Sequence, residues 1–181
     1  MKIEQKILPA LSSMKEVEKF LESEDTFGIL MNLHLGLLDG IIKEAHGKEK
    51  KILLHLDLTS GLTADVFGCE YACQVLQVDG IISTKVKVIE SAKKCRKIAI
   101  LRFFLIDSKS LEKGISICNT IRPDYVEVLP GIAYEIIPYI KEKVSCEIMC
   151  GGLLRSMEQI EKCMEAGACA VTISERYKKM K

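Results

Sequence analysis

Two charged side chains interrupt apolar segments in the middle of this sequence of 181 residues. Arg102 and Glu127 each have apolar residues on both sides. Burying a charged group costs free energy unless it is paired or binds a ligand. Arg102 therefore has two compatible interpretations. It can form an ion pair with Glu127 or Asp57, and its planar guanidinium can bind a phosphate group, whose geometry it matches.

Glycines near the C-terminal end indicate a site for an anion. Gly151 and Gly152 follow an apolar segment directly, and Ser174 follows the next one. Backbone N–H groups in such turns and at the helix starts behind them bind phosphate. Gly131, which follows an earlier apolar segment, lets the backbone approach the anion closely at a third point. The alternative is that Gly151 and Gly152 only form a tight turn before a helix capped by Ser156.

Two histidines, an aspartate and a lysine also follow apolar segments: His34, His55, Asp57 and Lys85. We interpret them as further ligand-binding residues. The alternative for each histidine is an ordinary hydrogen bond within the protein. His34, His55 and Asp57 could supply three zinc ligands, but their spacing does not favour zinc, and we expect no metal.

These residues must be positioned by a regular series of elements. Apolar runs that read as strands alternate with segments of helical spacing. The expected strands cover residues 7–10, 27–33, 51–57, 79–83, 97–106, 124–129, 146–150 and 169–173. The expected helices cover residues 14–21, 37–45, 65–77, 87–94, 110–121, 134–143 and 156–166.

The continuous apolar character of the strands predicts a parallel sheet buried on both faces. Eight strand-and-helix units predict an α/β fold, a single compact (β/α)8 TIM-type barrel of one domain over residues 1–181, with a short final helix. Such barrels usually exceed about 200 residues, so a doubly wound open sheet is the alternative. The barrel is favoured because the chain has no extra material for a second layer of connections.

A barrel of this type binds its ligand at the carboxyl ends of the strands, where the polar residues of this sequence stand. The loops after strands seven and eight commonly hold phosphate, which matches Gly151, Gly152 and Ser174. The predicted ligand-binding set is His34, His55, Asp57, Lys85, Arg102, Glu127, Gly131, Gly151, Gly152 and Ser174.

The overall charge gives no sign of nucleic-acid binding, because 26 Lys and Arg nearly balance 25 Asp and Glu. Any contact with RNA therefore needs a local basic surface. The candidates gather around the helix expected at residues 87–94, namely Lys85, Lys87, Lys93, Lys94, Arg96 and Lys97. The alternative is a solvated, positively charged helix end.

The composition is that of a globular protein, with 48% hydrophobic and 28% charged residues. The most apolar stretch, 28–42, is interrupted by polar residues and is too short to cross a membrane. The first six residues lack the apolar segment of a signal peptide. We therefore expect a cytoplasmic protein with no membrane contact, whose eight cysteines are reduced thiols.

Several short motifs resemble the glycerol uptake operon antiterminator regulatory protein family. They include His55-Leu56-Asp57-Leu58, the string Gly-Ile-Ile-Ser-Thr-Lys at 80–85, the string Glu-Val-Leu-Pro-Gly at 127–131, and Gly151-Gly152. The resemblance runs in order from about residue 7 to residue 174. It implies a barrel-fold regulator without a cofactor. In that family, sn-glycerol 3-phosphate binds the protein, which then binds the leader of glycerol-operon mRNA and prevents transcription termination.

Two other functions remain open from the residues alone. One is a phosphosugar-binding barrel enzyme (an isomerase, lyase or phosphodiesterase-like enzyme) with Glu127 as base and His55 as acid. The other is a metabolite sensor that acts through a protein partner. A homo-oligomer is compatible with each of these functions.

Overall fold

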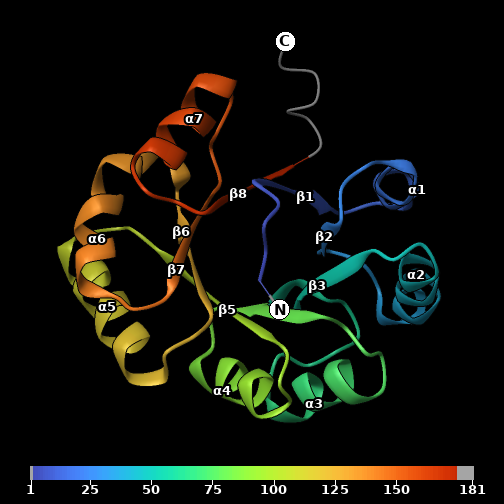
Figure 1. The fold of residues 1–181 in the computed structure, drawn as a ribbon. Coiled ribbons are helices and arrows are strands. Elements are labelled where there is room, and N and C mark those ends of the chain that lie inside the picture. The colour runs from blue at the N-terminus through green and yellow to red at the C-terminus, as the bar shows by residue number, and fades with distance from the viewer. Residues whose placement is uncertain (1, 175–181) are drawn as a thin grey trace.

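The computed structural model describes residues 2–174, in which eight parallel strands close into a barrel surrounded by helices (Figure 1). The strands are β1 (Ile7–Leu11), β2 (Phe27–Leu30), β3 (Lys51–His55), β4 (Gly80–Ser83), β5 (Ile98–Phe104), β6 (Tyr125–Leu129), β7 (Glu147–Gly151) and β8 (Ala170–Ser174). The helices are α1 (Met14–Glu22), α2 (Leu35–Gly47), α3 (Val66–Gln74), α4 (Val86–Lys94), α5 (Ser108–Ile121), α6 (Ile137–Lys143) and α7 (Met157–Glu165).

Each strand pairs with the next one along the chain, and β8 pairs with β1 to close the sheet. The register of the closing pair places Leu8 beside Thr172 and Ala10 beside Ser174. This pairing confirms the predicted (β/α)8 barrel and excludes the open, doubly wound sheet. The predicted short final helix lies outside the described residues.

The barrel has two apolar layers because each strand is buried on both faces. Alternate residues point inward, and an interior cluster that includes Leu53, Ile100, Tyr125 and Met149 fills the barrel. A larger cluster packs the outer face of the strands against the helices. This arrangement explains why the strands read as continuous apolar runs rather than as alternating ones.

Side-chain caps fix where several helices begin. Ser13, Asp65, Asp107 and Ser156 each accept a hydrogen bond from a backbone N–H in the first turn of the following helix. These caps satisfy N–H groups that have no partner inside the helix. The loops that leave the carboxyl ends of the strands are therefore anchored at their far ends.

Several expected elements differ from the structure near the strand ends. The strands expected at 27–33 and 97–106 end at Leu30 and Phe104. The strand expected at 51–57 ends at His55, because residues 56–58 form the short 3-10 helix η1 (Leu56–Leu58). The helix expected at 134–143 is divided into the 3-10 helix η2 (Gly131–Ile136) and α6. A proline at the start of α6 explains the division, since proline lacks the N–H that a continuous helix would need there.

Candidate functional site

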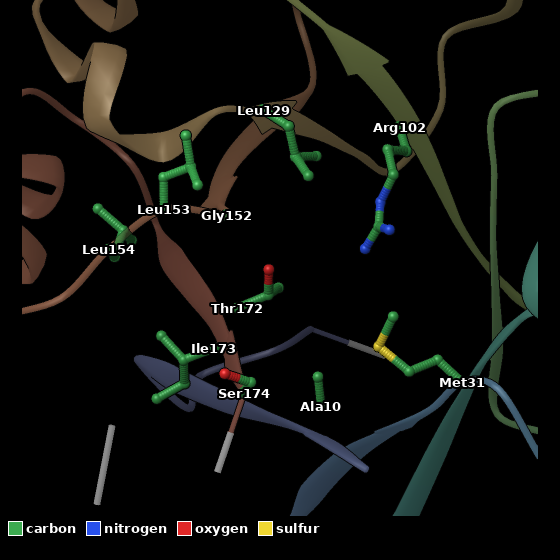
Figure 2. Close-up of a pocket in the computed structure, with 10 residues that line it drawn as sticks. All are labelled: Ala10, Met31, Arg102, Leu129, Gly152, Leu153, Leu154, Thr172, Ile173 and Ser174. Carbon is green, nitrogen blue, oxygen red and sulfur yellow. The ribbon is translucent and has the colours of Figure 1, made fainter. Parts of the chain in front are cut away.

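A small pocket of about 200 Å³ opens at the carboxyl end of the barrel (Figure 2). It lies beside the last strands of the sheet and the first two, and it takes residues from β1, β5, β6 and β8 and from the segments after β2 and β7. Its lining residues are Ala10, Met31, Arg102, Leu129, Gly152, Leu153, Leu154, Thr172, Ile173 and Ser174.

The polar residues of the pocket form the top layer of the barrel interior. Arg102 lies two residues beyond Ile100, and Thr172 lies two beyond Ala170, both of which belong to the interior apolar cluster. Because side chains alternate along a strand, Arg102 and Thr172 point inward as well. The barrel is thus apolar below and polar at its mouth.

Arg102 is held in place by Glu127 on the neighbouring strand. The Arg102 Nε donates to Glu127 Oε2 at 2.6 Å, and Thr172 Oγ1 donates to Glu127 Oε1. The Glu127 side chain is fully buried, and that of Arg102 is 10% exposed. Figure 2 shows the guanidinium directed into the pocket. The predicted ion pair is therefore with Glu127 rather than Asp57, and the terminal nitrogens of Arg102 face the space for a ligand.

Gly151 provides the room that this buried carboxylate needs. A Cβ at residue 151 would lie 2.3 Å from Thr172 Oγ1 and 2.8 Å from Glu127 Oε1. Both distances are shorter than any van der Waals contact, so a side chain at this position would displace the Glu127 carboxylate. Gly151 acts by its lack of a side chain and does not line the pocket itself.

The turn after β7 forms one wall of the pocket. Gly152 has φ +77°, a left-handed conformation that glycine adopts without strain. The N–H of Gly131 donates to the carbonyl of Gly152 at 3.0 Å, which joins this turn to the segment after β6. Within residues 2–174, no hydrogen bond uses the N–H of Gly152 or Leu153. Ser174 lies at the opposite wall, at the end of β8.

His55 is buried in the barrel without a hydrogen-bond partner. It lies two residues beyond the interior Leu53 and is 2% exposed. In the described part of the chain, its two ring nitrogens are the only fully buried side-chain N or O atoms that lack a partner. Burial, together with the positive charge of Arg102, lowers the pKa of His55 to about 4, against the opposing effect of Asp57 and Glu127. The ring is therefore neutral at physiological pH.

Asp57 joins the ends of β3 and β4 and does not line the pocket. It accepts hydrogen bonds from Ser83 Oγ at 2.5 Å and from the backbone N–H and Oγ1 of Thr84 at 2.7 and 2.9 Å. Burial works to raise the pKa of Asp57, but these hydrogen bonds outweigh it and hold the pKa below its ordinary value.

His34 and Lys85 also lie outside the pocket. His34 is exposed at the start of α2, where its Nδ1 accepts the N–H of Gly36 at 3.1 Å. The Lys85 ammonium donates to the carbonyl of Ala64 at 2.8 Å and so joins the β3–α3 and β4–α4 segments. The structure brings Arg102, Glu127 and the glycine turn together, but not these two residues. Their part in ligand binding stays a prediction.

The structure divides the expected basic cluster between the two ends of α4. Lys85 and Lys87 stand at the mouth, whereas Lys93, Lys94, Arg96 and Lys97 stand about 13 Å away at the opposite end of the barrel. Lys93 donates to the carbonyls of Ile121 and Arg122.

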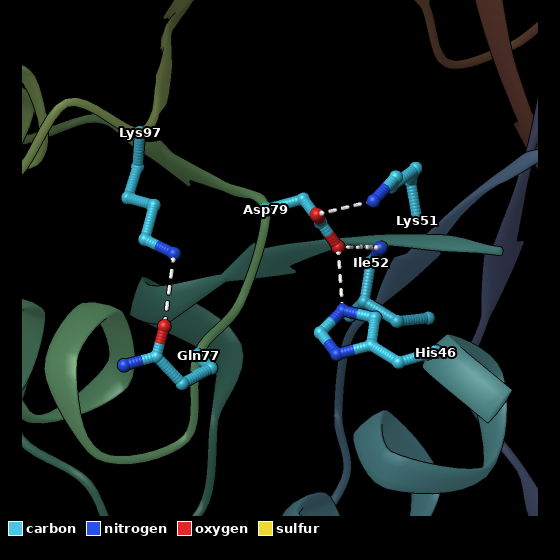
Figure 3. Close-up of polar contacts among 6 residues, drawn as sticks. All are labelled: His46, Lys51, Ile52, Gln77, Asp79 and Lys97. Carbon is cyan, nitrogen blue, oxygen red and sulfur yellow. Dashed lines mark hydrogen bonds and ion pairs between the residues drawn. The ribbon is translucent and has the colours of Figure 1, made fainter. Parts of the chain in front are cut away.

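Figure 3 shows polar contacts around Lys97, which follows the C-terminal end of α4. Lys97 lies 3.5 Å from Gln77 Oε1, beside an Asp79 carboxylate that accepts from the backbone of Ile52 and contacts His46 and Lys51. Lys94 and Arg96 remain exposed. Among the four basic residues from Lys93 to Lys97, Lys93 and Lys97 make side-chain hydrogen bonds, whereas no side-chain hydrogen bond or ion pair within residues 2–174 uses Lys94 or Arg96.

Residues 2–174 contain no group of three or more His, Cys, Asp or Glu placed to hold a metal ion. None of the described helices is long and apolar enough to cross a membrane.

Several residues that line the pocket were not among the ligand-binding residues predicted from the sequence. Thr172 shares the inward face with Ser174, and the alternation of side chains along β8 would have indicated it. The apolar walls Met31, Leu129 and Leu153 carried no comparable signal, because their types are equally common in a core.

Fold and site together define a parallel barrel with a small pocket at the ends of its last strands that an arginine enters, the position where many such barrels hold phosphate. A model of the glycerol-3-phosphate responsive antiterminator family matches residues 7–177 of this sequence. The chain belongs to that family.

Solved structures support the assignment. The glycerol uptake operon antiterminator regulatory protein from Listeria monocytogenes is 36% identical, with a TM-score of 0.90 over 95% of this chain and 92% of that one. A glycerol uptake operon antiterminator-related protein from Thermotoga maritima is 26% identical, with a TM-score of 0.83 over 96% and 97%. A putative deoxyribose-phosphate aldolase from Coccidioides immitis has a TM-score of 0.72 over 97% and 83%, but at 13% identity it shares the fold alone.

Proposed function

We propose that this protein binds sn-glycerol 3-phosphate in the pocket at the barrel mouth. We also propose that the liganded protein binds the leader of a glycerol-operon mRNA and prevents transcription termination. The family is one of regulators that respond to glycerol 3-phosphate. An mRNA partner would place the protein in the cytoplasm, as the sequence predicts.

One observation carries the ligand proposal. Arg102 is fixed by a fully buried Glu127 and directs its remaining donors into a pocket of about 200 Å³. The terminal guanidinium nitrogens suit two phosphate oxygens, and the N–H groups of the Gly152 turn offer further donors. The pocket volume suits a three-carbon phosphate rather than a nucleotide. The unpartnered His55 nearby would suit a hydroxyl group of the same ligand.

The geometry does not favour the enzyme alternative. Both oxygens of Glu127 already accept hydrogen bonds, one from Arg102 and one from Thr172, and the side chain has no exposure to solvent. A general base must reach the proton it removes. We therefore assign Glu127 to positioning Arg102 rather than to catalysis.

Thermal unfolding with three added compounds tests the ligand proposal. Glycerol 3-phosphate at about 100 times its Kd should stabilise the folded state by about 2.7 kcal/mol, whereas glycerol should stabilise it far less. Inorganic phosphate should have an intermediate effect, because it makes the charged contacts alone. Equal shifts with glycerol and glycerol 3-phosphate would contradict the assignment.

Arginine-to-lysine substitutions locate the site. Arg102→Lys keeps a positive charge beside Glu127 but loses the bidentate hydrogen bonding of the guanidinium. The affinity for glycerol 3-phosphate should therefore fall at least about tenfold. Arg96→Lys is the matched control at the other end of the barrel and should bind normally. Calorimetric titration of both variants measures the difference, and equal affinities would place the ligand elsewhere.

RNA binding is tested separately with a transcribed leader. The affinity, measured by filter binding, should rise when glycerol 3-phosphate is present and should fall as salt is added. Read-through of the leader terminator during in vitro transcription should rise in parallel. If the ligand binds but no leader RNA does, the protein is a metabolite sensor that acts through another partner.

A further inference from the structure

The outer face of α3 exposes three large apolar side chains beside the polar Gln74, although it faces away from the barrel. Phe67, Tyr71 and Val75 follow one another at intervals of four residues and so lie along one side of the helix and its C-terminal end. Phe67 is 79% exposed and Val75 is 60% exposed. The exposed face of a helix in a globular protein is normally polar. The neighbouring helix α4 follows that rule, with Lys87, Glu90 and Lys94 exposed.

A groove lies beside this stripe, between the first turns of α3 and α4. It has a volume of about 280 Å³. Its wall consists mainly of the aliphatic side chains of Ala64, Val66, Val86 and Val88, with Lys85, Lys87 and Asp65 also lining it. Phe67, the most exposed aromatic residue of the stripe, directly follows Val66 of the groove. One face of the molecule therefore offers both an apolar projection and an apolar recess.

The charges on this face are also of both signs. Glu70 lies on α3 beside the stripe, and Lys87 lines the groove. No ion pair found within residues 2–174 uses either of them. An apolar projection, an apolar recess, an acidic residue and a basic residue on one face are the features that an interface between two copies of the same surface uses.

We propose that a second copy of this chain covers the α3–α4 face through a two-fold axis. In a two-fold interface the same patch is used by both subunits, so each feature meets its complement in the other copy. Phe67 of each copy occupies the groove of the other, and Glu70 faces Lys87 of the partner subunit. Aromatic residues in apolar pockets are the usual energetic centres of such interfaces.

Sedimentation velocity of the full chain tests this proposal without ligand or RNA. The unmodified protein should be a dimer at about 20 µM, a concentration well above the Kd of an ordinary specific interface. Phe67→Glu should weaken association by about a hundredfold or more, because it puts a charge into the groove. Its melting temperature should stay close to that of the dissociated parent, since Phe67 is exposed in the single chain.

The matched control is Tyr139→Ser on α6, which removes an aromatic residue of similar exposure to Tyr71 from another part of the surface. This variant should remain dimeric. A monomeric unmodified protein, or a dimer that survives Phe67→Glu, would overturn the proposal.

Charge reversal tests the contact itself. Glu70→Lys and Lys87→Glu should each weaken the dimer about tenfold, because each change places like charges opposite one another. The double variant should restore association, which only a direct contact between these two residues explains. Failure of the double variant to recover would refute the stated geometry. None of these measurements involves glycerol 3-phosphate, so the dimer and the proposed function stand or fall separately.

Discussion

At the scale of single residues, the buried pair Arg102–Glu127 dominates the site. Its two members come from adjacent strands in register, and a third strand supplies Thr172. Glu127 reaches no solvent, so the pair is stable only while both charges are present. The pair therefore stabilises the barrel mouth and also orients the guanidinium N–H groups of Arg102 that we propose bind the ligand.

Removal of one partner should be far more damaging than removal of both. Arg102→Met leaves an uncompensated buried carboxylate and should destabilise the protein by about 3–5 kcal/mol. The double variant Arg102→Met/Glu127→Met replaces the pair with apolar side chains and should recover most of that loss. Urea denaturation of the three proteins measures the difference. A single variant that costs less than about 1 kcal/mol would show that Glu127 finds another partner.

His55 should make stability depend on pH in a defined window. Its pKa is about 4 in the folded protein and about 6.5 when unfolded, so the unfolded chain binds more protons between these values. Stability should therefore be unaffected by His55 above about pH 6.5 and should fall by about 3 kcal/mol as the pH drops to about 4. The contribution of Asp57, whose pKa is lowered, is lost only below about pH 4.

His55→Phe isolates this effect. The substitution removes two unsatisfied buried nitrogens and should raise stability by about 1–3 kcal/mol at pH 8. It should also remove the loss between pH 6.5 and 4 and weaken the binding of glycerol 3-phosphate. Denaturation curves at several pH values provide the measurement. An unchanged slope would assign the pH dependence to other groups.

The sequence was most informative for residues whose chemistry conflicts with their neighbours. Arg102 and Glu127 stood out because a charge within a buried strand requires a partner, and the structure pairs them. Asp57 and Lys85 are equally polar, but nearby hydroxyl and carbonyl groups bind them locally. Such local hydrogen bonds depend on loop conformation, which the hydrophobic pattern does not encode.

At the scale of elements, β7 and its turn show how one small residue shapes the site. The inward face of β7 presents Met149 to the apolar interior and Gly151 to the polar layer. Only a residue without a side chain leaves space there for Glu127 and Thr172. The strand itself was predictable from its apolar run, but the purpose of its last glycine was visible only once the barrel had closed.

Alanine substitutions at two glycines should have opposite effects. Gly151→Ala forces a Cβ against Thr172 and Glu127 and should destabilise the protein by about 1–3 kcal/mol. Gly40→Ala, within α2, meets no atom within 4 Å and should stabilise by about 0.5–1 kcal/mol through helix propensity. Thermal unfolding compares the two variants. A neutral Gly151→Ala would mean that the carboxylate can move aside.

At the scale of the whole molecule, the pocket lies at one end of the barrel and the exposed pair Lys94 and Arg96 lies at the other. The pocket is at the carboxyl ends of the strands, whereas Lys94 and Arg96 lie at the C-terminal end of α4, on the opposite side of the barrel. The sequence shows only that these residues are close together along the chain. Only the barrel shows that one helix separates Lys85 and Lys87 from the rest.

This separation makes the RNA surface testable. Lys94→Glu/Arg96→Glu should weaken leader binding and reduce its dependence on salt, by about one unit of slope per lost phosphate contact. These residues are exposed, so stability should not change. The control Lys109→Glu/Lys113→Glu reverses two exposed lysines on α5 and should bind normally. If the control loses affinity instead, RNA contacts the mouth side of the barrel.

The path of α4 from the mouth to the far end has a thermodynamic consequence. If RNA contacts the protein only around Lys94 and Arg96, the two ligands do not touch, and any influence between them passes through the barrel itself. Such an influence is reciprocal. The factor by which glycerol 3-phosphate raises the affinity for RNA must equal the factor by which RNA raises the affinity for glycerol 3-phosphate. A short leader fragment would then retain the metabolite on the protein.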